Sequence, residues 1–126
     1  MIILDTDALI ELIDKRSARG DVVYQTLMSA SEEVATTSLN LHEVLFGLLK
    51  YGKRSEALNS LPVLPFEESD ALLSARLEEE AEKRGHPVKR LDAMIAAVAI
   101  NWDARLYTFN RRHFAEFSES GLKMVD

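Results

Sequence analysis

Short apolar runs alternate with longer segments of helical periodicity along the 126 residues of this chain. Strands that alternate with helices are typical of a parallel sheet, because a helix returns the chain to the edge where the next strand begins. The pattern therefore predicts an α/β fold with three layers, α/β/α, in which a central parallel sheet of four to five strands lies between helices. The expected strands span residues 1–4, 34–36, 63–64, 106–108 and 122–125.

Capping and terminating residues set the expected bounds of the helices. Asp7 and Asp21 are expected to cap the first two helices, because aspartate is a preferred capping residue. Gly52 and Gly85 follow two later helical segments, and glycine is common just beyond the end of a helix. The expected helices span residues 7–14, a segment from about 21, a segment from 37 or 38 to 51, then 54–59, 67–84 and 90–103.

Length, composition and charge restrict the class of protein. The chain is expected to form one domain over residues 1–126, and the absence of cysteine excludes disulfides, thiol catalysis and thiolate metal sites. Asp5 and Asp7 interrupt the N-terminal apolar stretch, which predicts a cytoplasmic protein with neither signal peptide nor membrane partner. The net charge of −6 argues against non-specific nucleic-acid binding by the whole surface, although bound divalent cations reverse the sign inside an acidic cleft.

Four acidic or amide-bearing positions lie where expected strands end or expected helices begin. Asp5 ends the first apolar run, and Glu43 lies near the start of the helix that follows the second strand. Asp92 lies in the first turns of an alanine-rich helix, and Asn110 follows the fourth strand. Strand carboxyl ends and helix amino ends fall on one edge of a parallel sheet, which is where ligands bind. The four positions therefore predict one acidic cleft.

An acidic cleft without a histidine or cysteine partner predicts a site for a hard cation. Apolar residues surround Asp5 and Asp92, and a buried carboxylate without a cation is costly. Mg²⁺ suits oxygen ligands; once bound, it lowers the pKa of a coordinated water and stabilises charge on a phosphoryl oxygen. The predicted chemistry is hydrolysis of a phosphodiester by metal-activated water.

Several other polar residues are weaker candidates. Thr37 and Ser38 are alternative caps of the third helix, and Ser38 can also bond a cleft carboxylate or contact the substrate. His42 is a minor candidate for contact with substrate. Asp7 is interpreted as a cap or surface group, and His86 and His113 as structural residues. Basic residues beside two of the four positions are candidates for holding neighbouring phosphates, although a solvated surface charge is an equally good interpretation of each. They are Lys89, Arg90, Arg111 and Arg112.

Four segments follow one another in a recognisable order, at residues 4–10, 37–47, 91–97 and 106–110, with Phe114 beyond. This collinear set covers essentially the whole chain. It resembles a PIN domain, and more narrowly the VapC-type toxins of bacterial and archaeal toxin–antitoxin pairs. The resemblance implies a parallel sheet between helices and an endoribonuclease that depends on Mg²⁺ or Mn²⁺. It also implies an RNA substrate and a homodimer neutralised by a cognate antitoxin, whose tail enters the cleft.

The resemblance also implies roles for particular residues. Asp5, Glu43 and Asp92 correspond to metal-coordinating catalytic acids. Asn110 stands at the fourth catalytic position, where the family has Asp or Asn, and an amide oxygen can coordinate a metal but adds no charge. His113 stands where an acid often precedes the family's phenylalanine, so no metal role is expected for it.

Two alternatives to a metal-dependent ribonuclease remain open. The first is a PIN-like scaffold that binds RNA or protein without cleaving it; the three carboxylates argue against it, and the missing fourth charge argues for it. The second is a haloacid-dehalogenase-like phosphatase, because Asp5 and Asp7 resemble the aspartate pair of that family. Two features argue against this second alternative. Leu9 stands where that family has Thr or Val, and the family requires a paired-acid motif near the end of the chain.

Overall fold

A parallel five-stranded sheet forms the centre of the protein in a computed structural model that describes residues 1–14 and 17–126. The order of its strands is β3-β2-β1-β4-β5, and every pairing between neighbours is parallel. The predicted parallel sheet is therefore confirmed. The strands are β1 (Ile2–Leu4), β2 (Val34–Thr37), β3 (Val63–Leu64), β4 (Arg105–Tyr107) and β5 (Lys123–Met124).

Helices follow the strands nearly as the sequence predicts, with two differences. The segment expected to be a helix at residues 54–59 is a short 3-10 helix, η1 (Glu56–Ser60). A helical region that was not predicted, α6 (Arg111–Phe114) and the 3-10 helix η2 (Ala115–Ser120), fills the connection between β4 and β5. The other helices are α1 (Thr6–Ile13), α2 (Ala18–Ala30), α3 (Ser38–Lys50), α4 (Glu68–Lys83) and α5 (Arg90–Asn101).

The first two helices begin earlier than predicted because other residues occupy their capping positions. Asp5, and not Asp7, is at the capping position of α1. The hydroxyl of Ser17 accepts a hydrogen bond of 3.1 Å from the backbone N–H of Gly20 and so caps α2 ahead of Asp21. Gly20 is buried where a Cβ would overlap the carbonyl oxygen of Glu11. The absence of a side chain there lets the start of α2 pack directly on α1.

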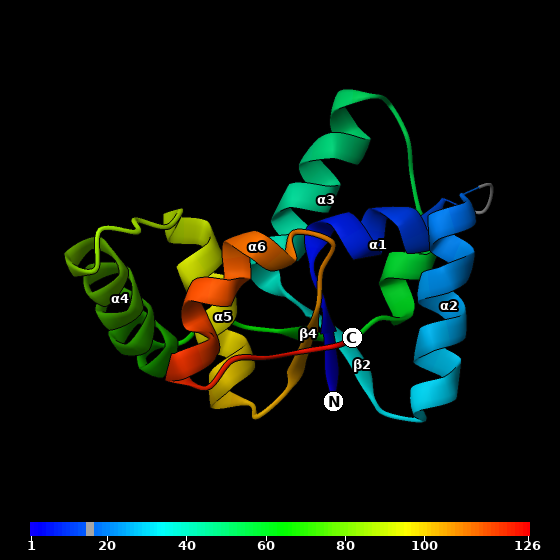
Figure 1. The fold of residues 1–126 in the computed structure, drawn as a ribbon. Helices are drawn as coiled ribbons and strands as arrows, with labels where there is room; N and C mark the ends of the chain where they lie inside the picture. Colours follow the sequence, from blue (N-terminus) through cyan, green and yellow to red (C-terminus); the bar gives the residue numbers. More distant parts are fainter. Residues whose placement is uncertain (15–16) are drawn as a thin grey trace.

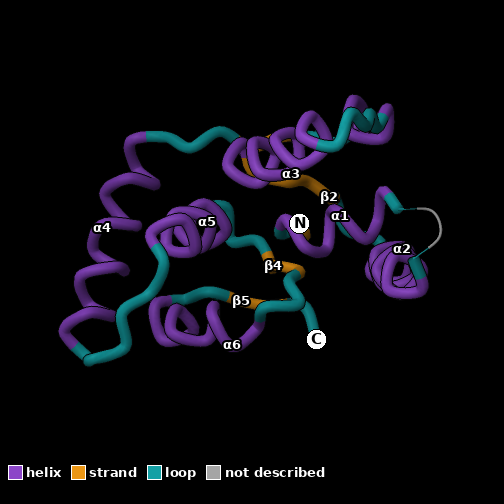
Figure 2. The backbone as a smooth tube through the Cα atoms, turned by 90° about the horizontal axis from the view of Figure 1, so that it is seen from above, coloured by secondary structure: helices purple, strands orange, loops and turns teal. Residues whose placement is uncertain are grey.

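Helices cover both faces of the sheet, as Figures 1 and 2 show. Successive strand residues point to opposite faces, so each strand contributes to two cores. Ile3 and Leu106 pack in the core that includes α4, α5 and α6, whereas Ile2 and Leu4 pack in the core that includes α1, α2 and α3. The small side chains of α5, among them a fully buried Ala96, let this helix lie close to the sheet. This confirms the predicted α/β/α architecture.

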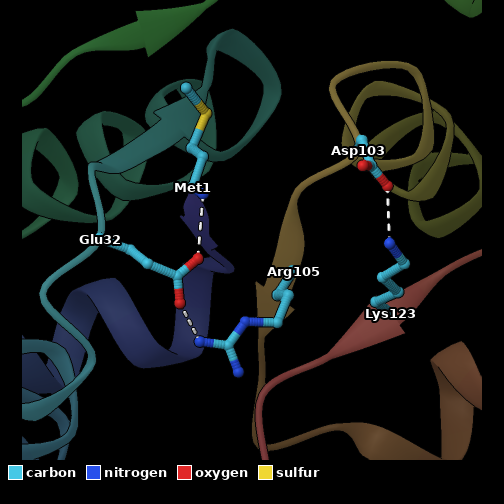
Figure 3. A network of polar contacts seen from close by, with 5 residues as sticks. All are labelled: Met1, Glu32, Asp103, Arg105 and Lys123. Atoms are coloured by element: carbon cyan, nitrogen blue, oxygen red, sulfur yellow. Dashed lines mark hydrogen bonds and ion pairs between the residues drawn. The ribbon is translucent and has the colours of Figure 1, made fainter.

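At the amino edge of the sheet, charged groups lie beside partners of opposite sign (Figure 3). The carboxylate of Glu32 accepts hydrogen bonds from the α-amino group of Met1, at 3.0 Å, and from the guanidinium of Arg105. The ammonium of Lys123 lies 2.8 Å from a carboxylate oxygen of Asp103. These pairs join segments that precede or begin strands.

Within residues 1–14 and 17–126, no helix is long and apolar enough to cross a membrane.

Candidate active site

The carboxyl edge of the sheet brings together side chains from distant parts of the sequence. The chain leaves β1 at Asp5 and leaves β4 at Thr108, and the backbone N–H of Asp5 donates to the carbonyl oxygen of Tyr107 at 2.9 Å. Asp5 and Thr108 therefore lie side by side although 103 residues separate them. Asp5 is 5% exposed and Thr108 3% exposed, so both are within the fold rather than on its surface.

The buried carboxylate of Asp5 is held by two neutral donors. The side-chain amide of Asn40 donates to Oδ1 at 2.9 Å, and the hydroxyl of Thr108 donates to Oδ2 at 2.7 Å. Burial raises the pKa of Asp5 to about 6; the hydrogen bond from Thr108 opposes this shift, and the charges of Asp7 and Asp92 add to it. Asp5 forms no ion pair with a cationic side chain of the described residues. It is therefore a carboxylate that favours a nearby cation.

Asn40 connects this carboxylate to a second one. Its side chain is fully buried at the start of α3, and its Oδ1 accepts a hydrogen bond of 2.7 Å from the hydroxyl of Thr37. Its Nδ2 donates both to Asp5 and, at 3.0 Å, to the hydroxyl of Thr6. That hydroxyl in turn donates to Oε1 of Glu43 at 2.6 Å. A chain of neutral donors thus fixes the positions of Asp5 and Glu43 relative to each other.

Asp7 belongs to the same edge, which corrects its interpretation as a cap or surface group. Its Oδ2 accepts a hydrogen bond of 3.0 Å from the backbone N–H of Phe109, and its Oδ1 one of 2.6 Å from the N–H of Ala8. Burial raises the pKa of Asp7, while these hydrogen bonds and the charge of Arg19 lower it. Its own charge raises the pKa of Asp5, so the two carboxylates repel each other.

Asp92 and Glu43 complete a set of acids that act on one another. Asp92 is half-buried in the first turn of α5, and burial raises its pKa. The nearby charges of His113 and Lys89 lower that pKa, whereas the charge of Glu43 raises it. Since Asp92 also raises the pKa of Asp5, the three acids predicted from the sequence lie near one another. We call Asp5, Asp7, Glu43 and Asp92 the acid cluster.

Asn110 lies at the same edge but presents its side chain to solvent. It is the exposed residue at the capping position of α6, and its side chain makes no capping hydrogen bond. Its backbone N–H donates to the hydroxyl of Thr108 at 3.0 Å, next to Asp5. His113, which was interpreted as structural, is exposed and lies close enough to Asp92 to affect its pKa.

The predicted substrate-binding residues differ in how free their side chains are. Arg90 donates from Nε and Nη2 to the carboxylate of Glu78, at 3.1–3.3 Å. Arg111 donates to the backbone carbonyl of Val125 and lies 3.7 Å from Asp126. Of the two candidate caps of α3, Thr37 and Ser38, the structure has Thr37 at the capping position, where its hydroxyl accepts from the backbone N–H of Asn40. Arg112 is exposed and has no ion-pair partner among the described residues.

The donor set of the acid cluster fits a hard cation. All of its ligands are carboxylate oxygens, and none of the four acids forms an ion pair within the described part of the chain. Nowhere in residues 1–14 and 17–126 do three His, Asp or Glu side chains lie close enough together to hold one ion as they stand. The two observations agree because charges act on one another beyond the radius of a coordination sphere, and like charges without a cation stay apart.

Fold and site together define a parallel α/β protein with an acidic site at the carboxyl edge of its sheet. Residues 2–119 match the model of the PIN domain. The chain belongs to the PIN domain family. This match confirms the predicted family and leaves the haloacid-dehalogenase-like alternative without support.

Relatives within the family include VapC-type proteins, as the sequence predicted. The chain is 26% identical to ribonuclease VapC1 of Methanocaldococcus jannaschii over an alignment of 128 residues. This alignment covers 99% of this chain and 87% of that protein. A solved structure with this fold is that of VapBC2 from Rickettsia felis bound to a DNA fragment from its promoter. The matched chain is 25% identical in sequence, with a TM-score of 0.76, and the match covers 99% of this chain and 98% of that one. FitAcB from Neisseria gonorrhoeae has a TM-score of 0.82 at 21% identity, covering 100% and 97%, which shows the shared fold.

Proposed function

We propose that this protein is an Mg²⁺-dependent endoribonuclease and the toxin of a VapBC-type toxin–antitoxin pair, with Mn²⁺ able to replace Mg²⁺. The main support is that Asp5, Glu43 and Asp92 lie near one another at the carboxyl edge of the sheet, and none of them forms an ion pair within the described residues. A cluster of carboxylates repels an RNA strand, so a nuclease built on it requires a cation between protein and phosphate. Membership of the PIN family and the ribonuclease named among its relatives support the same conclusion.

The residues of this chain would divide the work of catalysis among them. Asp5, Glu43 and Asp92 would hold the metal, which when bound lowers the pKa of a water and stabilises charge on a phosphoryl oxygen. Thr108 and Asn40 keep both oxygens of Asp5 hydrogen-bonded, which fixes the orientation of this carboxylate. Thr6 does the same for one oxygen of Glu43. Asn110 adds an amide oxygen at the edge without adding charge.

Substrate contacts come from the exposed cations around the acid cluster. Among the predicted contacts, Arg112 is exposed and has no ion-pair partner within residues 1–14 and 17–126, so its guanidinium can bind a phosphate. Arg90 and Arg111 would have to leave the partners that hold them. Ser38, partly buried at the first position of α3, is a further proposed contact.

Partners and domain organisation complete the proposal. The solved VapBC structures contain toxin and antitoxin, and a toxin–antitoxin complex from Klebsiella pneumoniae is 26% identical with a TM-score of 0.75, covering 91% of each chain. These likenesses support a cognate antitoxin that neutralises this protein. We further propose that the protein is a homodimer and that residues 1–126 form a single PIN domain. The family model, which extends over residues 2–119, supports the latter.

A scaffold that binds RNA without cutting it is the second candidate. Two observations favour it: the neutral Asn110 at the fourth position, and the spacing of the acids, which within the described residues is wider than metal ligation requires. Both candidates predict RNA binding, but only the nuclease predicts internal cleavage that depends on a divalent ion.

Cleavage of end-labelled RNA by the purified protein separates these candidates. We expect internal cuts with Mg²⁺ or Mn²⁺ and none with a chelator. Asp5→Asn, Glu43→Gln and Asp92→Asn should each reduce the rate by at least about a hundredfold, since the loss of a residue that only supports a ligand already costs up to that much. Glu32→Gln, at the opposite edge of the sheet, is the matched control and should cut normally. RNA binding without cleavage at any metal concentration would establish the scaffold instead.

A further inference from the structure

Arg19, near the start of α2, lies over an aromatic ring at the carboxyl edge. The central carbon of its guanidinium is 4.0 Å from the ring centroid of Phe109. Phe109 comes directly after Thr108, and its backbone N–H is hydrogen-bonded to Asp7. The arginine is exposed, whereas the phenylalanine is half-buried. An exposed cation is therefore held next to the acid cluster by a residue that itself contacts the cluster.

The surrounding structure fixes the position of this arginine. Gly20, the next residue, packs against the backbone of Glu11, and the hydroxyl of Ser17 caps the helix and donates to the carboxylate of Glu11. On the other side, the ring of Phe109 makes an edge-on contact with the ring of Tyr107, at 5.9 Å between centroids. Neither the helix start nor the aromatic platform can shift without breaking these contacts.

The guanidinium of Arg19 lies over a ring and donates no hydrogen bond to another residue of the described part of the chain. The contact with the ring is made over its face by the central carbon of the guanidinium and uses no N–H donor, so a phosphate can accept from two of these N–H groups. Arg19 lies close enough to Asp7 to lower the pKa of that carboxyl, yet it forms no ion pair with an acid of residues 1–14 or 17–126. It differs in this respect from Arg90 and Arg111, whose guanidinium groups are already engaged.

The position of Arg19 also complements that of Lys89, an exposed lysine on the other side of the acid cluster. Lys89 and His113 lie near Asp92, at the α5 side of the acid cluster. Arg19 lies near Asp7, at the α2 side, and α2 and α5 cover opposite faces of the sheet (Figure 2). A polyanionic strand that crosses the edge from one helical layer to the other would meet a cation before and after the acids.

We propose that Arg19, stacked on Phe109, binds a backbone phosphate of the RNA strand on the α2 side of the acid cluster. The inference rests on the proposed ribonuclease function and adds to it a substrate-binding residue that the sequence did not reveal. Its role is binding rather than chemistry. Loss of Arg19 should therefore weaken RNA binding and leave both metal affinity and the rate at saturating RNA unchanged.

Cleavage kinetics with a mixed-sequence, single-stranded RNA test this role. With saturating Mg²⁺, Arg19→Ala should raise KM roughly tenfold, the effect of losing one hydrogen-bonded charge, without changing kcat. The slope of log KM against log salt concentration should also fall by about 0.7, as expected when a single strand loses one phosphate contact. Arg19→Lys keeps the charge but not the planar fork, so it should retain the salt dependence while raising KM less. Arg76→Ala, which removes an exposed arginine of α4, is the matched control.

The possible outcomes separate this inference from the function on which it rests. If the unmodified protein cuts no RNA with Mg²⁺ or Mn²⁺, the proposed function fails and the inference fails with it. If it cuts RNA and Arg19→Ala leaves KM unchanged, the inference alone is wrong. A lower kcat together with altered Mn²⁺ affinity, measured by calorimetry without RNA, would also overturn it, because Arg19 would then act through the metal site and not by binding a phosphate. Should Arg19→Ala fail to fold in a thermal melt, the KM of Arg19→Lys decides the question in the same way.

Discussion

At the amino edge of the sheet the charged groups of Glu32 and Asp103 lie beside partners of opposite sign, whereas at the carboxyl edge carboxylates gather beside neutral donors. The amino-edge pairs lower the pKa of both acids, chiefly through hydrogen bonds from Arg105 and Lys123 (Figure 3). The carboxyl edge does the reverse, because burial raises the pKa of each shifted acid there. One edge is thus arranged to stabilise the fold, and the other to attract a cation that the chain itself does not supply.

The difference shows where this protein accepts a cost in stability. The three ion pairs of the amino edge contribute little to stability, but they do not oppose folding. Buried carboxylates that repel one another oppose folding when they are ionised; hydrogen bonds such as that from Thr108 to Asp5 offset part of the cost, and a bound cation offsets more. An arrangement of this kind is expected at functional sites rather than at structural ones. The predictions below test whether the two edges differ in this way.

The largest effect should be an opposite response of the two edges to pH. The pKa of Asp5 is about 6 in the folded protein, against an ordinary value of 3.8, so the folded state holds its proton more tightly than the unfolded chain. Its contribution to stability is therefore present below about pH 4 and is lost as pH rises through about 6. Without metal, the free energy of unfolding should fall by about 3 kcal/mol from this residue alone. Urea unfolding in a chelator, from about pH 4 to about pH 7, measures it.

Asp5→Asn is the variant that tests this assignment. It should flatten the fall in stability over the same range, and added Mg²⁺ should stabilise the variant less than the unmodified protein. The acids of the amino edge have lowered pKa values, so their contribution is lost in the opposite direction, as pH falls through those values. Metal-free stability that stays level as pH rises, with Asp5 intact, would mean that the two edges do not differ as described.

A second effect concerns Asn40, whose amide holds Asp5 and, through Thr6, Glu43. Asn40→Ala leaves the buried carboxylate of Asp5 with one donor fewer, which should cost about 1–3 kcal/mol of stability. Loss of a residue that orients a metal ligand should also weaken Mn²⁺ binding by roughly 10- to 100-fold. Calorimetry with Mn²⁺ and urea unfolding give the two quantities separately.

The chain offers a matched control for Asn40. Asn101 also donates from its amide to a buried aspartate, Asp70, at 2.7 Å, but on α5 and α4 rather than in the acid cluster. Asn101→Ala should lower stability and leave Mn²⁺ binding unchanged. Equal losses of Mn²⁺ affinity in both variants would show that Asn40 acts through general stability and not by orienting Asp5.

The outline of the site could be predicted from the sequence, and its supporting residues could not. Asp5 and Asp92 stand out because apolar residues surround them in the sequence and because strand ends and helix starts share one edge. Asn40 and Thr108 are neutral and lie 35 and 103 residues from Asp5, so only the folded structure shows that they hold it. Asp7 was interpreted as a cap because aspartate is so common at helix starts.

The fold shows the same division between local and long-range information. Short apolar runs that alternate with segments of helical periodicity predict the parallel sheet, because a helix returns the chain to the edge where the next strand begins. The short α6 and η2 were missed because a single turn of helix has too few residues to show a period. The exposed Arg19 gave no signal either, because its contact with Phe109 joins residues 90 positions apart and depends on the packing of α2 against α1.

A smaller effect should follow when charge is added to the carboxyl edge. Asn110 is exposed beside Thr108, so Asn110→Asp places a further carboxylate near the acid cluster in a well-solvated position. At that exposure one added charge is worth about 1 kcal/mol, which should tighten Mn²⁺ binding about fivefold. The Mg²⁺ concentration for half-maximal cleavage should fall by a similar factor. Unchanged affinity in calorimetry would place position 110 outside the metal site.

The smallest effect should come from the amino edge itself. Glu32→Gln removes the charge that pairs with the α-amino group of Met1 and with Arg105, so the melting temperature should fall slightly. Cleavage and Mn²⁺ affinity should stay at the level of the unmodified protein, because the paired groups lie at the opposite end of the strands from the acid cluster. A folded Glu32→Gln variant that has lost cleavage would mean that the amino edge also supports the site. An unchanged melting temperature would mean that the paired charges hold the strands no better than neutral groups do, and the contrast between the edges would then rest on the acid cluster alone.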